Sequence, residues 1–308
     1  VCSSDLPLAA LVESQDGTLK GLLQLHDGKQ VEWVLIPDKD HFTLCLSTQV
    51  GCSLGCSFCS TGQMGLERNL TAGEILAQVL TAREVLSTSQ SSWPLRNIVF
   101  MGMGEPLLNW AQVEKSLQNL RDSMAFGFSH RRVTVSTVGV PRILETFARS
   151  RLASLAVSLH APTQELRQEI MPKAAAMLPL PELMDRLRKL PLKPRQRITI
   201  EYILLGGIND YLEQAKELNR VLSSIKCKIN LISFNPAPDL PYEQPDPQRV
   251  LEFERFLWTK GQTVTLRKSK GQDIQAACGQ LRSTQLHQRA KTCVNGPETR
   301  SDHAQTRF

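Results

Sequence analysis

Residues 50–62 read VGCSLGCSFCSTG, and the three cysteines in this stretch decide how the whole chain is interpreted. Cys52, Cys56 and Cys59 have the spacing C-x₃-C-x₂-C, with Phe58 directly before the last of them. Three cysteines this close together can bind a cubane [4Fe–4S] cluster and leave one of its irons without a protein ligand. That open iron can chelate the amino and carboxylate groups of S-adenosylmethionine (SAM) and pass an electron to it.

A structural zinc site is the alternative for the same loop. Such a site normally needs four tetrahedral ligands, usually in two C-x₂₋₄-C pairs. The nearest further cysteine is Cys45, and no second pair accompanies it. The spacing therefore favours an iron–sulfur cluster over zinc or unrelated thiols.

The composition fits a cytoplasmic enzyme. The chain has 308 residues, 41% of them hydrophobic and 21% charged, enough for one large α/β domain with a buried core. Eight cysteines, three of them crowded in one loop, indicate a reducing compartment. No apolar run is long enough to span a membrane, and the first residues lack the pattern of a signal peptide. Because residue 1 is Val1 and not Met, we expect the chain to be a fragment or to begin at a non-native residue.

Short apolar runs alternate with amphipathic stretches, which predicts a parallel sheet with helical crossovers. The predicted strands are 42–46, 97–101, 133–136, 155–159, 198–203 and 228–232. The predicted helices are 72–86, 110–122, 141–149, 181–190 and 211–222. Six strands are too few to close an eight-stranded barrel, so we expect an α/β fold, an open, partial (β/α)₆ TIM-like barrel with its chemistry at the carboxyl ends of the strands.

Polar residues follow or end several of these strands. Gly104 and Glu105 follow the second strand, Ser136 ends the third, the run 158–160 (Ser-Leu-His) ends the fourth, and Asn235 follows the sixth. Each motif alone is weak, because a glycine-rich turn is more often only a turn and a lone histidine is more often structural. Their equivalent positions beside the cysteine loop predict one shared site.

The chain divides into three regions. Residues 1–40 are predicted to form a small β extension, with short strands around the turn at 26–28. Residues 41–285 are predicted to form the core barrel, which ends in a helix near 247–258, a strand at 263–266 and a short helix carrying AACGQL. Residues 286–308 are predicted to form a tail, whose last part, 295–308, lacks periodicity and is predicted to be disordered.

Several motifs together resemble the radical-SAM RNA methyltransferases that modify adenine, above all the RlmN-type family that acts at adenine C2 of 23S rRNA and tRNA. The resemblance extends from about residue 32 to about residue 291. It rests on TLCLSTQVGCSLGCSFCSTG, ERNLTAGEI, NIVFMGMGEPLLN, RRVTVSTVGV, LAVSLHAP, EYILLGGIND, CKINLISFNP and LRKSKGQDIQAACGQL. It implies a [4Fe–4S] cluster, two SAM molecules per turnover and a reducing electron donor such as flavodoxin or ferredoxin. It also implies that the extension at 1–40 is the remnant of an accessory RNA-binding domain.

The resemblance also implies roles for individual residues. Cys278, in AACGQL, would carry the methyl group as S-methylcysteine, and Cys45, in TLCLSTQ, would release the product and leave a disulfide. Glu32 would accept a proton. The implied cluster ligands are Cys52, Cys56 and Cys59, and the implied SAM contacts are Gly104, Glu105, Ser136, Ser158, Leu159, His160 and Asn235.

This chemistry explains why such residues are needed. Adenine C2 is electron-poor and carries no lone pair, so ordinary alkylation by SAM does not reach it. In the implied mechanism, one SAM methylates Cys278 and a second supplies the radical that activates the S-methyl group. The activated carbon joins C2 and links RNA to protein until Cys45 attacks the sulfur of Cys278.

Three alternatives stay open from the sequence. The C8-specific Cfr-type relatives share the cysteines and much of the barrel, although the run 49–52 favours C2. A radical-SAM enzyme for a peptide or small molecule would need neither Cys45 nor Cys278. A non-catalytic iron–sulfur or zinc RNA-binding module would need no SAM motif at the strand ends.

Basic residues supply a possible RNA contact. The net charge is +6, and basic groups occur at 131–132, 193–197 and 267–270. Such groups can neutralise phosphates, although most basic triplets are ordinary solvated surface. The residues that we expect near the mouth of the barrel are Arg131, Arg132, Arg267, Lys268 and Lys270.

Overall fold

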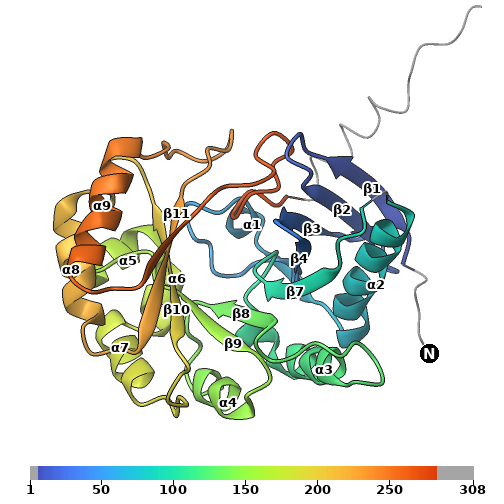
Figure 1. Cartoon of the computed structure of the whole chain (residues 1–308), viewed down its shortest axis with the longest axis horizontal. Helices are drawn as coiled ribbons and strands as arrows, with labels where there is room; N and C mark the ends of the chain where they lie inside the picture. Colours follow the sequence, from blue (N-terminus) through green and yellow to red (C-terminus); the bar gives the residue numbers. More distant parts are fainter. Residues whose placement is uncertain (1–5, 90, 283–308) are drawn as a thin grey trace, which may run out of the picture.

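One curved sheet of ten strands forms the centre of the computed structural model, which describes residues 6–89 and 91–282 (Figure 1). The strand order is β1-β2-β3-β4-β7-β8-β9-β10-β11-β12, and the helices pack on the outer face of the sheet. The sheet is open between its edge strands β1 and β12. This architecture confirms the predicted partial barrel. The predicted tail, together with Cys2 and Cys293, lies outside the described residues.

The barrel part of the sheet consists of parallel strands. All six predicted strands are confirmed, and the strand predicted near 263–266 joins them as a seventh at the edge. The strands are β4 (His41–Cys45), β7 (Leu95–Phe100), β8 (Val133–Thr137), β9 (Ser154–Ser158), β10 (Ile198–Leu204), β11 (Cys227–Ser233) and β12 (Val264–Arg267). Because these strands are parallel, all their carboxyl ends lie at the same end of the barrel.

The amino-terminal strands continue the same sheet. They are β1 (Leu8–Glu13), β2 (Leu19–Gln24) and β3 (Gln30–Asp38). Each is antiparallel to the next, and β3 is antiparallel to β4. The sequence predicted β2 and β3 but missed β1. Val31, Trp33 and Leu35 on β3 are fully buried, so this part of the sheet shares the core with the barrel.

The helices cross over between parallel strands and bury one face against the sheet. The five predicted crossover helices and the predicted helix near 247–258 are all observed, with ends shifted by at most a few residues. They are α2 (Ala72–Thr88), α3 (Trp110–Arg121), α4 (Ile143–Ser150), α7 (Leu180–Arg188), α8 (Leu212–Leu222) and α9 (Pro247–Thr259). α2 begins with a capping box, in which Thr71 Oγ1 accepts from Glu74 N–H and Thr71 N–H donates to Glu74 Oε2. Within the described ranges, no helix is long and apolar enough to cross a membrane.

Several short elements near the site were not predicted. They are the hairpin of β5 (Gln49–Gly51) and β6 (Leu66–Asn69), α1 (Ser60–Gln63), the 3₁₀ turn η1 (Pro106–Asn109), α5 (Gln164–Ile170) and α6 (Pro172–Met177). The predicted short helix carrying AACGQL is wrong, because these residues form only turns and bends. Gln275 has φ +54° and Gly279 has φ +81°, and two left-handed residues so close together interrupt a right-handed helix.

Candidate active site at the carboxyl ends of the strands

Two adjoining cavities lie at the carboxyl ends of the parallel strands. The first, which we call the cluster cavity, has a volume of about 160 Å³ and is lined by the three loop cysteines. The second, the thiol cavity, has a volume of about 90 Å³ and is lined by Cys45 and Cys278. Both cavities share Cys59, Arg267 and Cys278 in their walls. The cysteines that the sequence singled out therefore come together from distant parts of the chain.

The cysteine loop is fixed by backbone contacts and by packing. Cys52 N–H donates to Gly65 O at 2.8 Å, and Cys59 N–H donates to Cys56 O at 3.1 Å. The ring of Phe58 meets the ring of His160 edge to face, with centroids 5.0 Å apart. The aromatic residue between the last two cysteines thus anchors the loop to the end of β9.

Burial controls the protonation of the loop thiols. It raises the pKa of Cys52 to about 11, and burial together with the neighbouring thiols raises the pKa of Cys56 well above its ordinary value. Burial also raises the pKa of Cys59. All three side chains are therefore thiols at neutral pH, and binding of a metal group must displace their protons.

The carboxylate of Glu105 lies in the wall of the cluster cavity and joins the ends of β7 and β8. Its Oε1 accepts from Leu107 N–H at 3.0 Å and its Oε2 accepts from Val138 N–H at 3.0 Å. Burial raises the pKa of Glu105, against the effect of these hydrogen bonds. The preceding residue, Gly104, has φ +98°, and a Cβ there would lie 2.6 Å from Gln49, so this turn requires glycine.

His160 also lines the cluster cavity, as a neutral imidazole. Its Nδ1 accepts a hydrogen bond from Ile203 N–H at 3.0 Å, which leaves Nε2 protonated. Burial, and then the charge of Arg167, lowers the pKa of His160 to about 3. Beside it, the hydroxyls of Ser136 and Ser158 are 3.2 Å apart and line the same cavity. The ring can offer a donor to a ligand but not a positive charge.

Three other predicted site residues do not line the cluster cavity. Asn235 lies in the thiol cavity, where its Oδ1 accepts from Gln272 Nε2 at 2.5 Å. Leu159 contributes its side chain to the hydrophobic core and lines neither cavity. Glu32 is fully buried and lines neither cavity. Its carboxylate instead accepts a hydrogen bond from Arg282 N–H at 2.9 Å.

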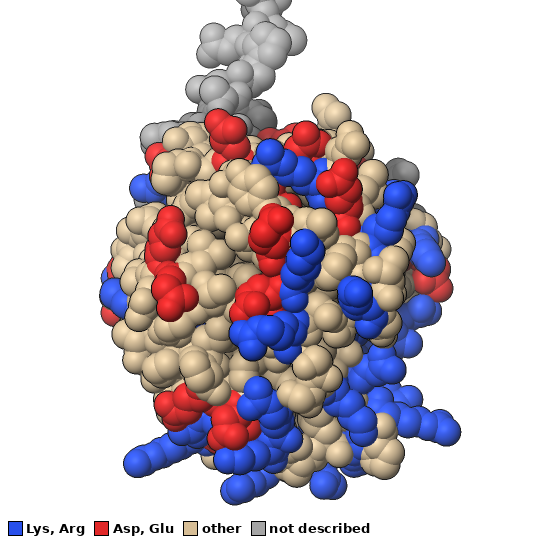
Figure 2. Space-filling model, turned by 90° about the vertical axis from the view of Figure 1, so that its left-hand side faces the viewer, with Lys and Arg blue, Asp and Glu red and all other residues tan. Residues whose placement is uncertain are grey.

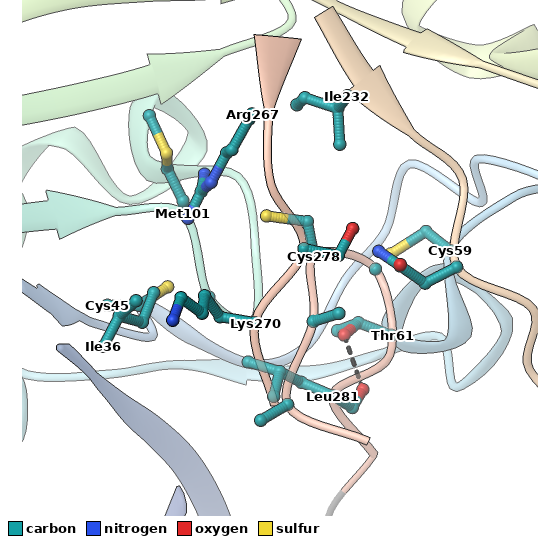
Figure 3. A pocket seen from close by; sticks show the side chains of 16 residues that line it. Ile36, Cys45, Cys59, Thr61, Met101, Ile232, Arg267, Lys270, Cys278 and Leu281 are labelled. Atoms are coloured by element: carbon teal, nitrogen blue, oxygen red, sulfur yellow. Dashed lines mark hydrogen bonds between the residues drawn. The ribbon is translucent and has the colours of Figure 1, made fainter. Parts of the chain in front are cut away.

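Cys45 and Cys278 face the thiol cavity from opposite elements, the end of β4 and the irregular segment after β12 (Figure 3). Figure 3 shows the sulfur of Cys278 on the side of the cavity where Met101 and Arg267 lie, with Cys59 on the other side. Burial and the nearby Cys278 raise the pKa of Cys45 to about 12. Both cysteines are free thiols in this structure.

The Cys278 segment packs directly on the cysteine loop. Ser60 N–H donates to Gly279 O at 2.7 Å, and Thr61 Oγ1 donates to Leu281 O at 2.7 Å. A Cβ at Gly279, where φ is +81°, would lie 3.3 Å from the Phe58 carbonyl oxygen. Glycine at this position lets the segment approach the loop closely.

Comparison with known proteins agrees with this geometry. A family model described as the radical SAM superfamily matches residues 46–218. A dual-specificity RNA methyltransferase RlmN from Solidesulfovibrio magneticus is 57% identical over 278 residues, which cover 90% of this chain and 79% of the relative. An RlmN from Geobacter sulfurreducens is 49% identical over 279 residues, which cover 91% of this chain and 75% of the relative. The chain belongs to the RlmN family of radical SAM enzymes.

Solved structures agree with the RlmN assignment. The crystal structure of a radical SAM methyltransferase from Sphaerobacter thermophilus has a TM-score of 0.85 and 42% identity, and the match covers 90% of this chain and 81% of that one. SuiB of Streptococcus suis bound to SAM has a TM-score of 0.51 at 13% identity, covering 74% of this chain and 52% of that one, which shows the shared fold alone. As an RlmN-family member, the chain is a SAM-dependent methyltransferase whose cofactors are a [4Fe–4S] cluster and SAM.

The donor set of this RlmN-family site fits a cluster. Among the described residues, no group of three or more His, Cys, Asp or Glu side chains lies close enough together to hold one metal ion. A cubane is bound through three different irons, so its cysteine sulfurs lie farther apart than the ligands of a single ion. Arg167 is fully buried, and its Nε has no hydrogen-bond partner. Its positive charge favours the thiolate form of Cys56, because it acts to lower the pKa of that cysteine. A buried cation beside the loop suits an anionic thiolate-bound cluster.

The sequence did not identify two charged residues of the RlmN-family site. Arg267 was expected to contact RNA phosphates, but it lines both cavities, and its interactions with Cys278 and Glu201 raise its pKa. Glu201 lies in the cluster cavity and accepts from Asn230 Nδ2 at 2.9 Å. The sequence did contain a signal for Glu201, because it is the one charged residue of the strand β10. The placement of Arg131 and Arg132 near the mouth is wrong, since both precede β8 and lie at the opposite end of the barrel.

Proposed function

We propose that the chain methylates C2 of adenine in RNA, with 23S rRNA and tRNA as substrates. The observation that carries this proposal is the meeting of Cys45 and Cys278 in a cavity that adjoins the cluster cavity. An enzyme that only abstracts hydrogen from its substrate needs the cluster loop alone. Two further cysteines at the same place support a mechanism that uses a methyl carrier and a releasing thiol.

The residues around the cofactors hold them in position. Cys52, Cys56 and Cys59 bind the cluster, and the strand-end residues around Glu105 and Ser158 bind SAM. When bound, the cluster and SAM supply a one-electron cleavage that activates an otherwise inert methyl group. The protein orients the cofactors and excludes water from them. Buried residues in the wall of the cluster cavity support this exclusion of water.

The two thiols of the thiol cavity divide the methyl transfer between them. Cys278 accepts the methyl group on sulfur and, after activation, becomes linked through that carbon to C2 of the base. C2 then loses its proton and Cys45 attacks the sulfur of Cys278. The bond between this sulfur and the linking carbon breaks, that carbon takes up a proton to become the methyl group, the one electron used for SAM cleavage is given back, and a disulfide forms between the two cysteines. A cellular reductant such as flavodoxin, ferredoxin or a dithiol must supply two electrons to restore the thiols.

Mass spectrometry tests this proposal on the purified, cluster-loaded protein. Incubation with SAM, without RNA, is expected to add the mass of one CH₂ unit to the peptide containing Cys278. With RNA present, nucleoside analysis is expected to find 2-methyladenosine. The absence of any mark on Cys278 would overturn the carrier role, and 8-methyladenosine would assign the C8 chemistry instead.

A basic group near the thiol cavity supports RNA as the substrate. Lys270 lines the thiol cavity, and Lys268 and Lys270 line a further cavity that shares residues with it and whose walls come from β3, β12 and the barrel strands β4, β7, β8, β10 and β11. Figure 2 shows that other Lys and Arg side chains gather at the lower end of the molecule, where α7 lies in Figure 1. Lys193 and Arg195, in the loop before β10, belong to the amino ends of the strands. The two groups therefore lie at opposite ends of the barrel.

Replacement of Lys268 and Lys270 by glutamine is expected to weaken RNA binding. Each lost phosphate contact should lower the slope of log affinity against log salt concentration by about 0.7 to 0.9 units. The measurement is RNA binding over a series of salt concentrations. Lys193→Gln/Arg195→Gln is the matched control and should leave the slope unchanged. Equal effects of the two double variants would remove the special role of the 268–270 group.

A further inference from the structure

The segment that carries Cys278, residues 271–282, closes the open side of the barrel. It has no helix or strand and comes shortly after β12, one edge of the sheet. Besides the cysteine loop, it contacts the strands and turns near the other edge, where Gly271 N–H donates to Asp16 Oδ2 at 3.0 Å. Figure 1 shows the carboxyl-terminal trace running from β12 toward the amino-terminal strands. The position of Cys278 therefore depends on contacts with β1–β3 and the turns between them.

A buried ion pair lies at the centre of these contacts. Lys20 on β2 and Glu32 on β3 are 3% and 0% exposed, and Lys20 Nζ lies 3.6 Å from Glu32 Oε1. Lys20 Nζ also donates to Gln275 O at 3.1 Å, and Glu32 Oε2 accepts from Arg282 N–H at 2.9 Å. The pair thus contacts the segment on both sides of Cys278.

Net stability alone does not account for such a pair. Desolvation of two buried charges offsets most of their attraction, so apolar residues of similar size often stabilise a fold equally well. The pair instead fixes the orientation of the 271–282 segment, because Lys20 binds one of its backbone carbonyls and Glu32 binds one of its backbone N–H groups. Gln275 has φ +54°, which is uncommon for a residue other than glycine, and its carbonyl is the group that Lys20 holds.

We propose that Lys20 is a positioning residue for Cys278. Together with Glu32, it holds the 271–282 segment over the two cavities, so that the Cys278 sulfur stays in the wall that they share. The proposal rests on the proposed function in one respect, the role of Cys278 as methyl carrier. It also gives Glu32 a role that its burial outside both cavities supports.

Hydrogen exchange tests the positioning directly in the cluster-loaded protein. The variant is Lys20→Met/Glu32→Gln, which removes the ammonium group without leaving an unpaired buried carboxylate. Amides in peptides covering 271–282 are expected to exchange on the order of tenfold faster, as the loss of hydrogen bonds to charged groups predicts. Iodoacetamide should alkylate Cys278 several-fold faster, while alkylation of Cys227 on β11 stays unchanged.

Methylation of Cys278 by SAM provides a second readout. The rate of methylation is expected to fall about tenfold in the double variant, while SAM binding and iron content remain at the wild-type level. Lys20→Arg should restore the rate, because it retains a donor and the charge. Lys29→Met is the matched control, since Lys29 forms an exposed ion pair with Glu67 beside the same strands.

The outcomes separate this proposal from the proposed function. Unchanged exchange and alkylation in the double variant would overturn the positioning role, and so would faster exchange throughout the chain, which indicates general destabilisation. Failure of Lys20→Arg to restore the rate would also overturn it. A wild-type protein that never acquires the methyl mark, while exchange at 271–282 still responds to the double variant, would overturn the proposed function and leave the positioning of the segment standing.

Discussion

The Cys45→Ala variant is expected to begin the reaction and then stop, with RNA covalently linked to the protein. Cys45 is buried in the thiol cavity opposite Cys278, and in the proposed mechanism it acts only after the bond to the base has formed. The other cysteine in the wall of this cavity, Cys59, is a cluster ligand in the proposed mechanism, so without Cys45 no free thiol there can attack the sulfur of Cys278. The adduct should approach one RNA per chain, and multiple turnover should be lost.

Denaturing gels and mass spectrometry measure this adduct. Cys227→Ala is the matched control, because Cys227 is a buried cysteine on β11 that lines neither cavity. That variant should turn over without an adduct. Methylated RNA released by Cys45→Ala at the wild-type rate would remove Cys45 from the mechanism. Loss of the adduct in Cys45→Ala/Cys278→Ala would locate the link at Cys278.

The Cys56→Ala variant is expected to lose both its cluster and the ability to cleave SAM. The wild-type protein, purified without oxygen, should contain about four irons and four sulfides per chain. Cys56 is the middle ligand of the loop, and alanine retains the backbone contact in which Cys59 N–H donates to the carbonyl of residue 56. The loop should therefore fold while the cluster fails to bind.

Iron and sulfide analysis and the visible spectrum measure the effect of Cys56→Ala. SAM cleavage, followed as release of 5′-deoxyadenosine, should fall to background. Cys227→Ala should retain full iron content. Stoichiometric zinc without iron in the reconstituted wild-type protein would contradict the assignment of the cofactor, and so would wild-type iron content in Cys56→Ala.

Local patterns predicted most of the barrel. The alternation of apolar runs with amphipathic stretches located all seven parallel strands and placed the start of α2 at residue 72 correctly. These features depend on residues close together in sequence, where spacing alone reflects the structure. The cysteine pattern predicted the cluster loop for the same reason.

Long-range features could not be predicted in this way. Whether Arg267 faces solvent or a cavity depends on how β12 pairs with β11, and a basic triplet carries no information about that pairing. The AACGQL segment has helix-forming residues, but its conformation is set by contacts with the cysteine loop and with β2 and β3. The burial of Glu32 likewise depends on a segment that lies far away in the sequence.

The closure of the barrel by its last described segment also sets an order of assembly. The hydrogen bond between Ser14 and Asp273 spans 259 residues of sequence, and the one between Arg282 and Glu32 spans 250. During synthesis the chain emerges from the ribosome amino end first, at roughly 5–20 residues per second. The cysteine loop is therefore exposed for many seconds before the segment that covers it exists. The loop is therefore accessible to cluster insertion during synthesis, before the closing segment packs against it.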